Sequence, residues 1–502
     1  MEKRYVLAID QGTTGTRVIL FDHEGEAKAN AYHEIRQIYP HPGWVEHDPN
    51  EYWNTFLLCC GEIFSDSAFS VSDLAAIGIT NQRETTILWD TRTGDPVYNA
   101  IVWQCRRSAP LCDGLKAAGH EALIAAKTGL RIDAYFSATK IRWILDNVEG
   151  VREKVSQGRI MMGTIDTWLI WKLSGGESHV TDYSNASRTL LFNIYEKRWD
   201  DELLSILGIP REILPEPRPS SGILAWTAPA AFFGARVPVA GVAGDQHAAT
   251  FGQACFEPGM AKNTYGTALA LFMNTGETPV VSKAGLTTNL GWHVGGKTEY
   301  ALEGVIFIGG AAVQWLRDGL RIIDDSTHCD KLAASVADTG GVYMVPAFTG
   351  LGAPYWDMYA RGLIIGITGG SGRAQLARAA LESIAYQTRD VMDAMALDFG
   401  RAAPSLKVDG GATKSGFLMQ FQADILGIPV ERPKVTEMAA RGAAYLAGLA
   451  VGFWKNRAEL AGHWKLDRAF DPRMSVDQRE GMYARWMKAV ARSFEWSERE
   501  TL

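Results

Sequence analysis

The chain has 502 residues, of which 47% are hydrophobic and 21% are charged. Because a single hydrophobic core stops growing at about 250 to 300 residues, this length predicts two large domains, and the composition excludes a disordered or fibrous protein. The formal net charge of -7 excludes a basic footprint for nucleic acid or acidic membranes, so small-molecule ligands are expected.

The N-terminal segment predicts a β-hairpin. Residues 5–9 and 17–21 are apolar runs of strand length, and they flank a turn at 10–14. The first run is too short for the apolar region of a signal peptide, and no stretch approaches the ~20 apolar residues of a membrane span. We therefore expect a cytoplasmic protein. The six cysteines lack CxxC spacing, which argues against a zinc site or a disulfide framework.

A second segment repeats the design of the first. Residues 260–263 lead into a turn at 265–267, a strand at 268–273 and another turn at 274–276. The repetition predicts two related halves, and we place their boundary so that the domains are 1–248 and 249–502.

Helical spacing of apolar residues predicts two helices in the second half. They lie within 376–395 and 417–425, and Gly427 is expected to end the second. Strands and long helices mixed in both halves predict an α/β fold.

Glycine-rich turns are the first candidates for a functional site. A turn with little side-chain bulk lets several backbone N–H groups approach a phosphate, and residues 10–17 add threonine hydroxyls, the charge of Arg17 and a possible metal ligand, Asp10. Taken alone, such a segment is more often an ordinary hairpin turn. Three further glycine-centred turns, at 265–267, 309–310 and 408–413, favour ligand binding. The chain has no GxxxxGK[ST] motif, which excludes a P-loop kinase.

These turns resemble the two phosphate loops and the adenosine loop of the superfamily that contains sugar kinases, large chaperones and actin. Within it, the chain resembles the FGGY family of carbohydrate kinases, because residues 135–147 are similar to the first signature of that family and residues 362–382 to the second. The resemblance extends over nearly the whole chain. It implies two actin-like (ribonuclease H-like) α/β domains with a nucleotide and substrate cleft between them.

More narrowly, the chain is similar to the family members that phosphorylate glycerol. The similar stretches are 42–49, 79–86, 102–107, 163–171, 244–246, 346–356 and 408–412. The resemblance implies transfer of a phosphoryl group from ATP to glycerol, which gives sn-glycerol 3-phosphate as the first step of glycerol catabolism. It also implies Mg²⁺ as cofactor, ATP as co-substrate, and a homodimer or homotetramer.

The resemblance also implies roles for individual residues. Glycerol contacts are expected at Arg83, Glu84, Trp103, Tyr135, Asp245 and Gln246. Nucleotide and phosphate contacts are expected at Thr13, Thr14, Arg17, Thr267, Gly310, Gln314, Gly411, Ala412 and Ser415. Metal ligands are expected at Asp10 and Asp245.

The chemistry of the glycerol residues suits a small polyol. Arg83 offers a fork of donors, Glu84 is an acceptor, and Trp103 and Tyr135 can form walls. Without the resemblance, the simpler interpretation is that Arg83 and Glu84 form a surface ion pair and that Trp103 is a core aromatic residue.

Asp245 has two interpretations as well. An aspartate between a strand and a helix is usually a helix cap, whereas the resemblance implies a general base that accepts the proton of the attacking hydroxyl. His247, two residues further on, matches no expected contact, so we predict a structural role for it. Two positions depart from the family pattern: Ser415 stands where an asparagine is usual, and Ala270 where an aromatic residue is usual.

Two other functions stay open at this point. A kinase for a pentulose or another polyol would keep the fold and the phosphate loops and would differ only in the substrate wall. A nucleotide-dependent assembly protein like actin or the large chaperones would need polymer contacts or an appended peptide-binding domain, and nothing after residue 470 is long enough for one.

Overall fold

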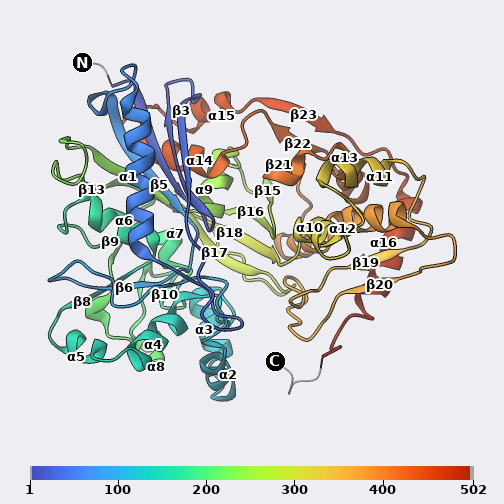
Figure 1. Ribbon diagram of the computed structural model, residues 1–502, viewed down its shortest axis with the longest axis horizontal. Coiled ribbons are helices and arrows are strands. Elements are labelled where there is room, and N and C mark those ends of the chain that lie inside the picture. The colour runs from blue at the N-terminus through green and yellow to red at the C-terminus, as the bar shows by residue number, and fades with distance from the viewer. Residues whose placement is uncertain (1–2, 498–502) are drawn as a thin grey trace.

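The computed structural model describes residues 3–497, and two mixed β-sheets with surrounding helices form its two halves (Figure 1). The first sheet has the order β13-β14-β5-β1-β2-β3 and the second the order β17-β18-β16-β15-β21-β22-β23. The strands of the first sheet are β1 (Tyr5–Gln11), β2 (Gly15–Phe21), β3 (Ala27–Glu34), β5 (Leu74–Asn81), β13 (Ser221–Trp226) and β14 (Pro238–Gly244). Those of the second are β15 (Ala261–Tyr265), β16 (Leu269–Gly276), β17 (Thr287–Val294), β18 (Lys297–Ile306), β21 (Leu406–Asp409), β22 (Val430–Pro433) and β23 (Leu466–Phe470).

The two sheets share one topology. β1 pairs antiparallel with β2 and parallel with β5, and β15 pairs in the same two ways with β16 and β21. An antiparallel third strand (β3 or β18) and a further parallel strand (β14 or β22) complete a common core of five strands. The prediction of two related α/β halves, each opening with a hairpin, is therefore confirmed.

One predicted turn in the second hairpin is wrong. The turn expected at 274–276 is strand, because β16 continues to Gly276 with Asn274 paired to Ala301 and Gly276 to Tyr300 of β18. The register of the pairing shifts between Asn274 and Gly276, and Gly276 adopts a positive φ there. This irregularity lets the strand continue through the glycine.

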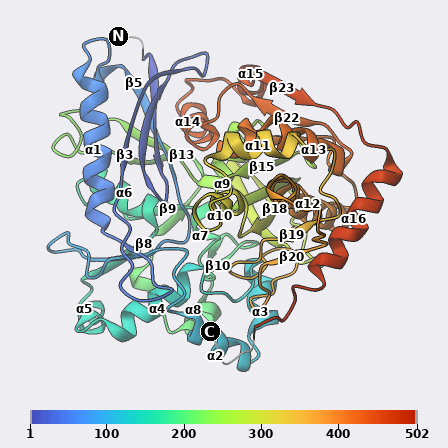
Figure 2. The ribbon, with the colours of Figure 1, turned by 45° about the vertical axis from the view of Figure 1, so that its right-hand side comes forward.

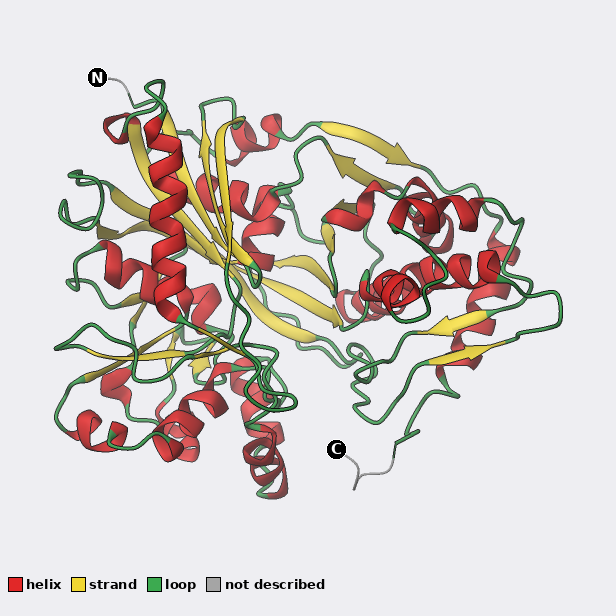
Figure 3. Ribbon diagram, in the orientation of Figure 1, coloured by secondary structure: helices red, strands yellow, loops and turns green. Residues whose placement is uncertain are grey.

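Helices cover both sheets, and short strands lie beyond them (Figure 3). Those of the first half are α1 (Pro49–Ser65), α2 (Ala109–Ala117), α3 (Glu121–Thr128), α4 (Ser137–Asn147), α5 (Val151–Ser156), α6 (Ile165–Leu173), α7 (Tyr183–Ala186), α8 (Asp201–Leu207) and α9 (Asp245–Gly252). Those of the second half are α10 (Ala311–Asp318), α11 (Ser326–Ala334), α12 (Arg373–Phe399), α13 (Gly416–Leu426), α14 (Met438–Ala450), α15 (Arg457–His463) and α16 (Val476–Val490). The short strands, which form five pairs, are β4 (Glu46–His47) with β7 (Ala100–Ile101), β6 (Ile87–Asp90) with β8 (Ile160–Gly163), β9 (Val180–Asp182) with β12 (Glu216–Arg218), β10 (Phe192–Asn193) with β11 (Arg198–Trp199), and β19 (Tyr343–Val345) with β20 (Leu363–Ile365).

Both predicted helices of the second half are present as α12 and α13. Gly427 caps α13 with a left-handed φ of 71°, a conformation that glycine adopts without a steric cost, as the sequence predicted. None of the described helices has the length and apolar content that crossing a membrane requires.

The two halves share a tightly packed core at helix α14. Although α14 belongs to the second half of the sequence, it packs on β5 and β14 of the first sheet and on α9, as Figures 1 and 2 show. Glycines permit this approach, since a Cβ on Gly442 would lie 1.8 Å from the carbonyl oxygen of Ala248 and one on Gly78 would lie 2.2 Å from that of Ala443. The proposed division between residues 248 and 249 falls within α9, so the core continues across it.

Candidate functional site

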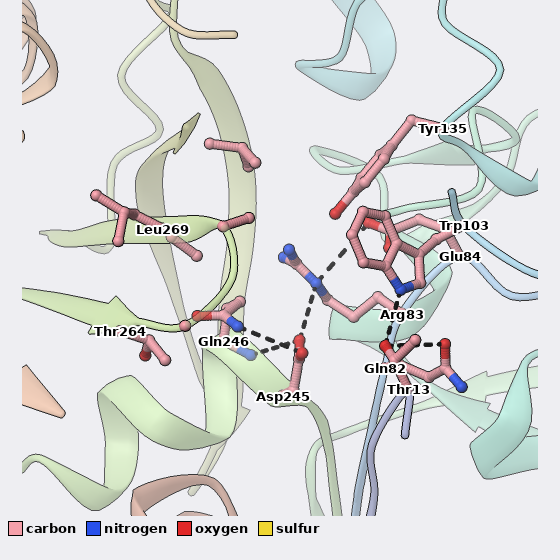
Figure 4. A pocket seen from close by; sticks show the side chains of 14 residues that line it. Thr13, Gln82, Arg83, Glu84, Trp103, Tyr135, Asp245, Gln246, Thr264 and Leu269 are labelled. Atoms are coloured by element: carbon pink, nitrogen blue, oxygen red, sulfur yellow. Dashed lines mark hydrogen bonds and ion pairs between the residues drawn. The ribbon is translucent and has the colours of Figure 1, made fainter. Parts of the chain in front are cut away.

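A cavity of about 170 Å³ lies between the two halves (Figure 4). Its lining from the first half is Thr13, Gln82, Arg83, Glu84, Trp103, Tyr135, Asp245 and Gln246, and from the second half Thr264, Gly266, Ala268, Leu269, Ala270 and Val305. All six residues predicted to contact the substrate are thus brought together, with one residue from each of the two predicted phosphate turns.

Parallel strand pairing explains why Arg83 and Asp245 meet. β5 and β14 run side by side with Asn81 paired to Gly244, so the residues that follow each strand leave the same edge of the sheet. Gly244 is needed for this approach, because an added Cβ would lie 2.6 Å from the Arg83 side chain. The Nε atom of Arg83 consequently lies 3.2 Å from Oδ1 of Asp245.

Glu84 occupies a strained backbone position at the cavity wall. Its φ of 57° is unusual for a residue other than glycine, and its carbonyl oxygen is held by the hydroxyls of Thr86 at 3.1 Å and Ser137 at 3.0 Å. The side chains of Arg83 and Glu84 are only 3% and 1% exposed, so the interpretation of this pair as a surface ion pair is wrong.

Arg83 has one donor group left for a ligand. Its Nη2 donates to Oε1 of Glu303 at 2.6 Å, whereas its buried Nη1 has no hydrogen-bond partner among residues 3–497. A buried donor without a partner costs free energy, and a hydroxyl of a bound molecule would satisfy it.

Trp103 and Tyr135 form one aromatic wall. Their rings meet edge to face at 5.5 Å, and Nε1 of Trp103 donates to the Thr13 hydroxyl at 3.0 Å. The wall is therefore connected to the turn of the first hairpin. Burial raises the pKa of Tyr135 well above its usual value, so its hydroxyl stays protonated and can donate.

Asp245 is the first residue of α9, and the cap position itself is Gly244. Its Oδ1 accepts from the Gln246 amide at 2.7 Å and its Oδ2 from Nε2 of Gln246 at 3.3 Å, while 32% of the side chain stays exposed toward the cavity. His247 lies outside the lining. It is fully buried with its ring 4.8 Å from that of Phe272, and burial lowers its pKa well below the usual value.

Asp10 lies at the end of β1, opposite Arg17 in the hairpin. Burial, and then the charge of Asp245, raise the pKa of Asp10 to about 7. Two carboxylates that repel each other in this way are suited to a divalent cation. Within residues 3–497 no group of three or more His, Cys, Asp or Glu side chains could hold a metal. Mg²⁺ usually binds through one or two carboxylates, waters and substrate phosphates, so Asp10 and Asp245 are the candidate protein ligands.

The remaining predicted nucleotide residues lie outside the cavity lining. Thr14 and Arg17 belong to the first hairpin, Thr267 to the second, Gly310 and Gln314 to the start of α10, and Gly411 and Ala412 to a 3-10 turn (Gly411–Lys414). The turns of the second half adjoin one another, since the Gly310 amide donates to the Gly266 carbonyl at 2.9 Å and a Cβ on Gly410 would lie 2.6 Å from the Tyr265 carbonyl oxygen.

Ser415 has two structural partners. Its hydroxyl accepts from the Leu418 amide at 2.9 Å as the N-cap of α13, and it donates to Asp330. A contact of Ser415 with adenine stays a prediction.

Sequence reasoning missed several residues of the site. Gln82 and Thr264 line the cavity, and Glu303 holds Arg83 from β18. Gln82 directly precedes Arg83 and could have been included for that reason. Thr264 and Glu303 carried no local signal, because only strand pairing brings Thr264 to the cavity and Glu303 to Arg83.

Comparisons of sequence and structure with known proteins all point to the same family. Residues 5–252 match the N-terminal domain, and residues 261–451 the C-terminal domain, of the FGGY family of carbohydrate kinases. The chain is 61% identical to a glycerol kinase of Symbiobacterium thermophilum and 60% identical to glycerol kinase 2 of Thermotoga maritima, over 99% of this chain and 100% of each relative. The crystal structure of Plasmodium falciparum glycerol kinase with ADP is 36% identical and superimposes with a TM-score of 0.92 over 98% of both chains.

Proposed function

Because the chain belongs to the FGGY family of carbohydrate kinases, we propose that it transfers the γ-phosphoryl group of ATP to glycerol, giving sn-glycerol 3-phosphate and ADP. One observation carries the proposal: the cavity that holds Arg83, Glu84 and Asp245 is also lined by Thr13 and Gly266, one from each predicted phosphate turn. A small polyol and a phosphate chain can therefore meet in one place. The glycerol kinases at about 60% identity support glycerol as the acceptor.

The side chains have complementary roles in this reaction. The unpartnered Nη1 of Arg83 and the carboxylate of Glu84 bind two hydroxyls of glycerol, and the rings of Trp103 and Tyr135 cover its carbon atoms. The carboxylate of Asp245 accepts the proton of the third hydroxyl as that oxygen bonds to the γ-phosphorus. The bond between the γ-phosphorus and the β,γ-bridging oxygen then breaks, and ADP leaves with that oxygen.

Asp10 and Asp245 are the residues that would hold Mg²⁺ in this proposal. When bound, the ion neutralises charge on the phosphate chain. Burial, and then the charge of Asp245, raise the pKa of Asp10 to about 7, which supports an acidic pair that needs a counter-charge. A cytoplasmic location, expected because the sequence shows no signal-peptide or membrane-span pattern, stays a prediction. A homodimeric or homotetrameric assembly, which the family resemblance implies, stays one as well.

Replacement of Asp245 by Asn tests the role of the base. General-base catalysis typically contributes about 10²- to 10⁴-fold, so Asp245→Asn should lower turnover in a coupled ADP-release assay by that factor while ATP binding and the melting temperature stay close to wild type. Asp325→Asn is the matched control, because Asp325 caps α11 through the His328 amide at 2.7 Å and lies outside the cavity lining. If the Asp245 variant retains more than a tenth of the wild-type turnover, Asp245 is not the base.

The same assay tests the acceptor. Glycerol, dihydroxyacetone, xylulose, ribulose and erythritol are compared as substrates of the wild-type enzyme. If the enzyme prefers a pentulose to glycerol, the pentulose is the acceptor. The proposed transfer of the γ-phosphoryl group from ATP would be unaffected by that result.

A further inference from the structure

Four charged side chains form a closed, buried ring behind the cavity. Arg83 donates to Oε1 of Glu303 at 2.6 Å, Arg188 contacts Oε2 of the same glutamate at 2.6 Å, and Nε of Arg188 donates to Glu84 at 2.6 Å. Nε of Arg83 lies 3.8 Å from Oε1 of Glu84, which closes the ring. Arg83 and Glu84 line the cavity, whereas Arg188 and Glu303 do not.

The charged side chains of the ring are almost completely excluded from solvent. The four side chains are between 0% and 3% exposed. Burial alone would raise the pKa of Glu303, but the guanidinium groups of Arg188 and Arg83 outweigh it and hold the pKa below its usual value. Removing ions from water costs free energy that their attraction often fails to offset, so a buried network of this kind is weak evidence of a purely stabilising role.

Further partners fix the two residues behind the cavity. Arg188 donates to Oδ1 of Asn289 and lies 5.0 Å above the ring of Phe136. Glu303 accepts from Nδ2 of Asn289 at 3.1 Å. Because Glu303 and Asn289 belong to β18 and β17, the second half of the chain holds substrate-facing side chains of the first half in place.

We propose that Glu303 and Arg188 are positioning residues for the acceptor: together they hold the guanidinium group of Arg83 and the carboxylate of Glu84 in place at the cavity wall. This inference rests on the proposed function for its substrate. The carboxylate of Glu303 connects Arg83 to Arg188, and the guanidinium group of Arg188 connects Glu303 to Glu84. Neither Arg83 nor Glu84 can therefore rotate without breaking a charged hydrogen bond. Such orientation is what lets a site reject a polyol that lacks one hydroxyl.

Glu303→Gln is the direct test, because it keeps the shape of the side chain and turns one acceptor oxygen into a donor that faces a guanidinium group. We expect the KM for glycerol to rise about tenfold or more, with kcat and the KM for ATP within about threefold of wild type. The ratio of kcat/KM for glycerol to that for 1,2-propanediol should also fall about tenfold, because the diol lacks a hydroxyl for the Arg83 and Glu84 end of the site.

Asp390→Asn is the control for a merely structural effect. Asp390 is another buried carboxylate, held by Nε1 of Trp486 at 3.0 Å and the Tyr483 hydroxyl at 2.7 Å, and it lies outside the cavity lining. This control can lower the melting temperature but should leave unchanged the KM for glycerol and the ratio of kcat/KM for glycerol to that for 1,2-propanediol. Arg188→Lys keeps the charge while losing the fork, so it should reproduce the Glu303→Gln effect even if that variant folds poorly.

The outcomes separate the two proposals. Wild-type enzyme that fails to phosphorylate glycerol would overturn the proposed function. The positioning role alone would be overturned by a different result: the wild-type enzyme phosphorylates glycerol, and the folded Glu303→Gln and Arg188→Lys variants match it. The quantities to match are the KM for glycerol and the ratio of kcat/KM for glycerol to that for 1,2-propanediol. An equal change in the Asp390→Asn control would overturn the positioning role as well.

Discussion

Ala270 offers a quantitative test of the shape of the acceptor site. On β16 it pairs with Thr264 of β15 and Val305 of β18, and all three line the cavity. The family resemblance implies an aromatic residue at this position. Phe272, which points to the same face of the strand, cannot replace that ring because it is fully buried against His247. The cavity of about 170 Å³ is therefore larger at Ala270 than it would be with an aromatic residue.

The cost of the missing ring follows from its area. A phenyl ring that covers one side of a three-carbon ligand removes roughly 40 to 80 Å² of apolar surface from water, which at about 25 cal/mol per Å² amounts to about 1 to 2 kcal/mol. Since about 1.4 kcal/mol is a tenfold change in affinity, Ala270→Phe should tighten glycerol binding roughly five- to thirtyfold. The smaller cavity should at the same time reduce activity on the four-carbon polyol erythritol.

Initial rates of ADP release over a range of glycerol and erythritol concentrations measure both effects. Ala270→Leu is the matched control, because it fills volume without adding a ring and should produce a smaller gain for glycerol with a similar loss for erythritol. The KM for ATP should stay constant in both variants. If Ala270→Phe folds normally and leaves the constants for both polyols unchanged, position 270 does not contact the acceptor, and the reasoning from cavity size is wrong.

Three further predictions concern the metal, the core and pH. Asp10→Ala should abolish Mg²⁺-dependent turnover, and a several-fold loss with an unchanged Mg²⁺ titration would place the metal elsewhere. Gly442→Ala should lower the melting temperature because its Cβ meets the Ala248 carbonyl, whereas Gly481→Ala, in an exposed turn of α16 with no neighbour within 4 Å, should raise it slightly; equal shifts would contradict the packing argument. Burial raises the pKa of Asp390 to about 7, so the protonated form favours the folded state, and wild-type stability should fall between about pH 4 and 7 relative to Asp390→Asn. If the melting temperatures of the two proteins change with pH in parallel over that range, the raised pKa of Asp390 is contradicted.

Local patterns predicted much of the fold. The hairpins that open the two halves, helices α12 and α13, and the glycine cap at Gly427 all depend on short-range signals that the sequence carries. The turn predicted at 274–276 was wrong because the conformation there is set by a strand distant in the sequence: only pairing with β18 shows that β16 continues. The packing of α14 on the first sheet was equally inaccessible, because Gly78 and Gly442, which permit it, lie in separate halves of the chain.

The site was predictable in part, for a related reason. Arg83, Glu84 and Asp245 were found through resemblance to short family stretches, and the structure adds that they share one cavity. Glu303 escaped notice because it lies 220 residues from Arg83 in the chain and resembles any other glutamate in a strand. Residues that act through another residue leave no local pattern, so their detection requires coordinates.

The repeated topology also explains where the chemistry lies. Asp10, Arg83 and Asp245 lie at or just beyond the carboxyl ends of β1, β5 and β14, which run parallel, and Gly266 and Gly410 follow the parallel strands β15 and β21. Ligands of open α/β sheets bind in the crevice outside the carboxyl ends of the strands. Ala270 is different, since it lies within a strand and changes only the wall. We infer that the acceptor can be altered at a wall position such as 270 while the loop residues that handle the phosphate stay in place.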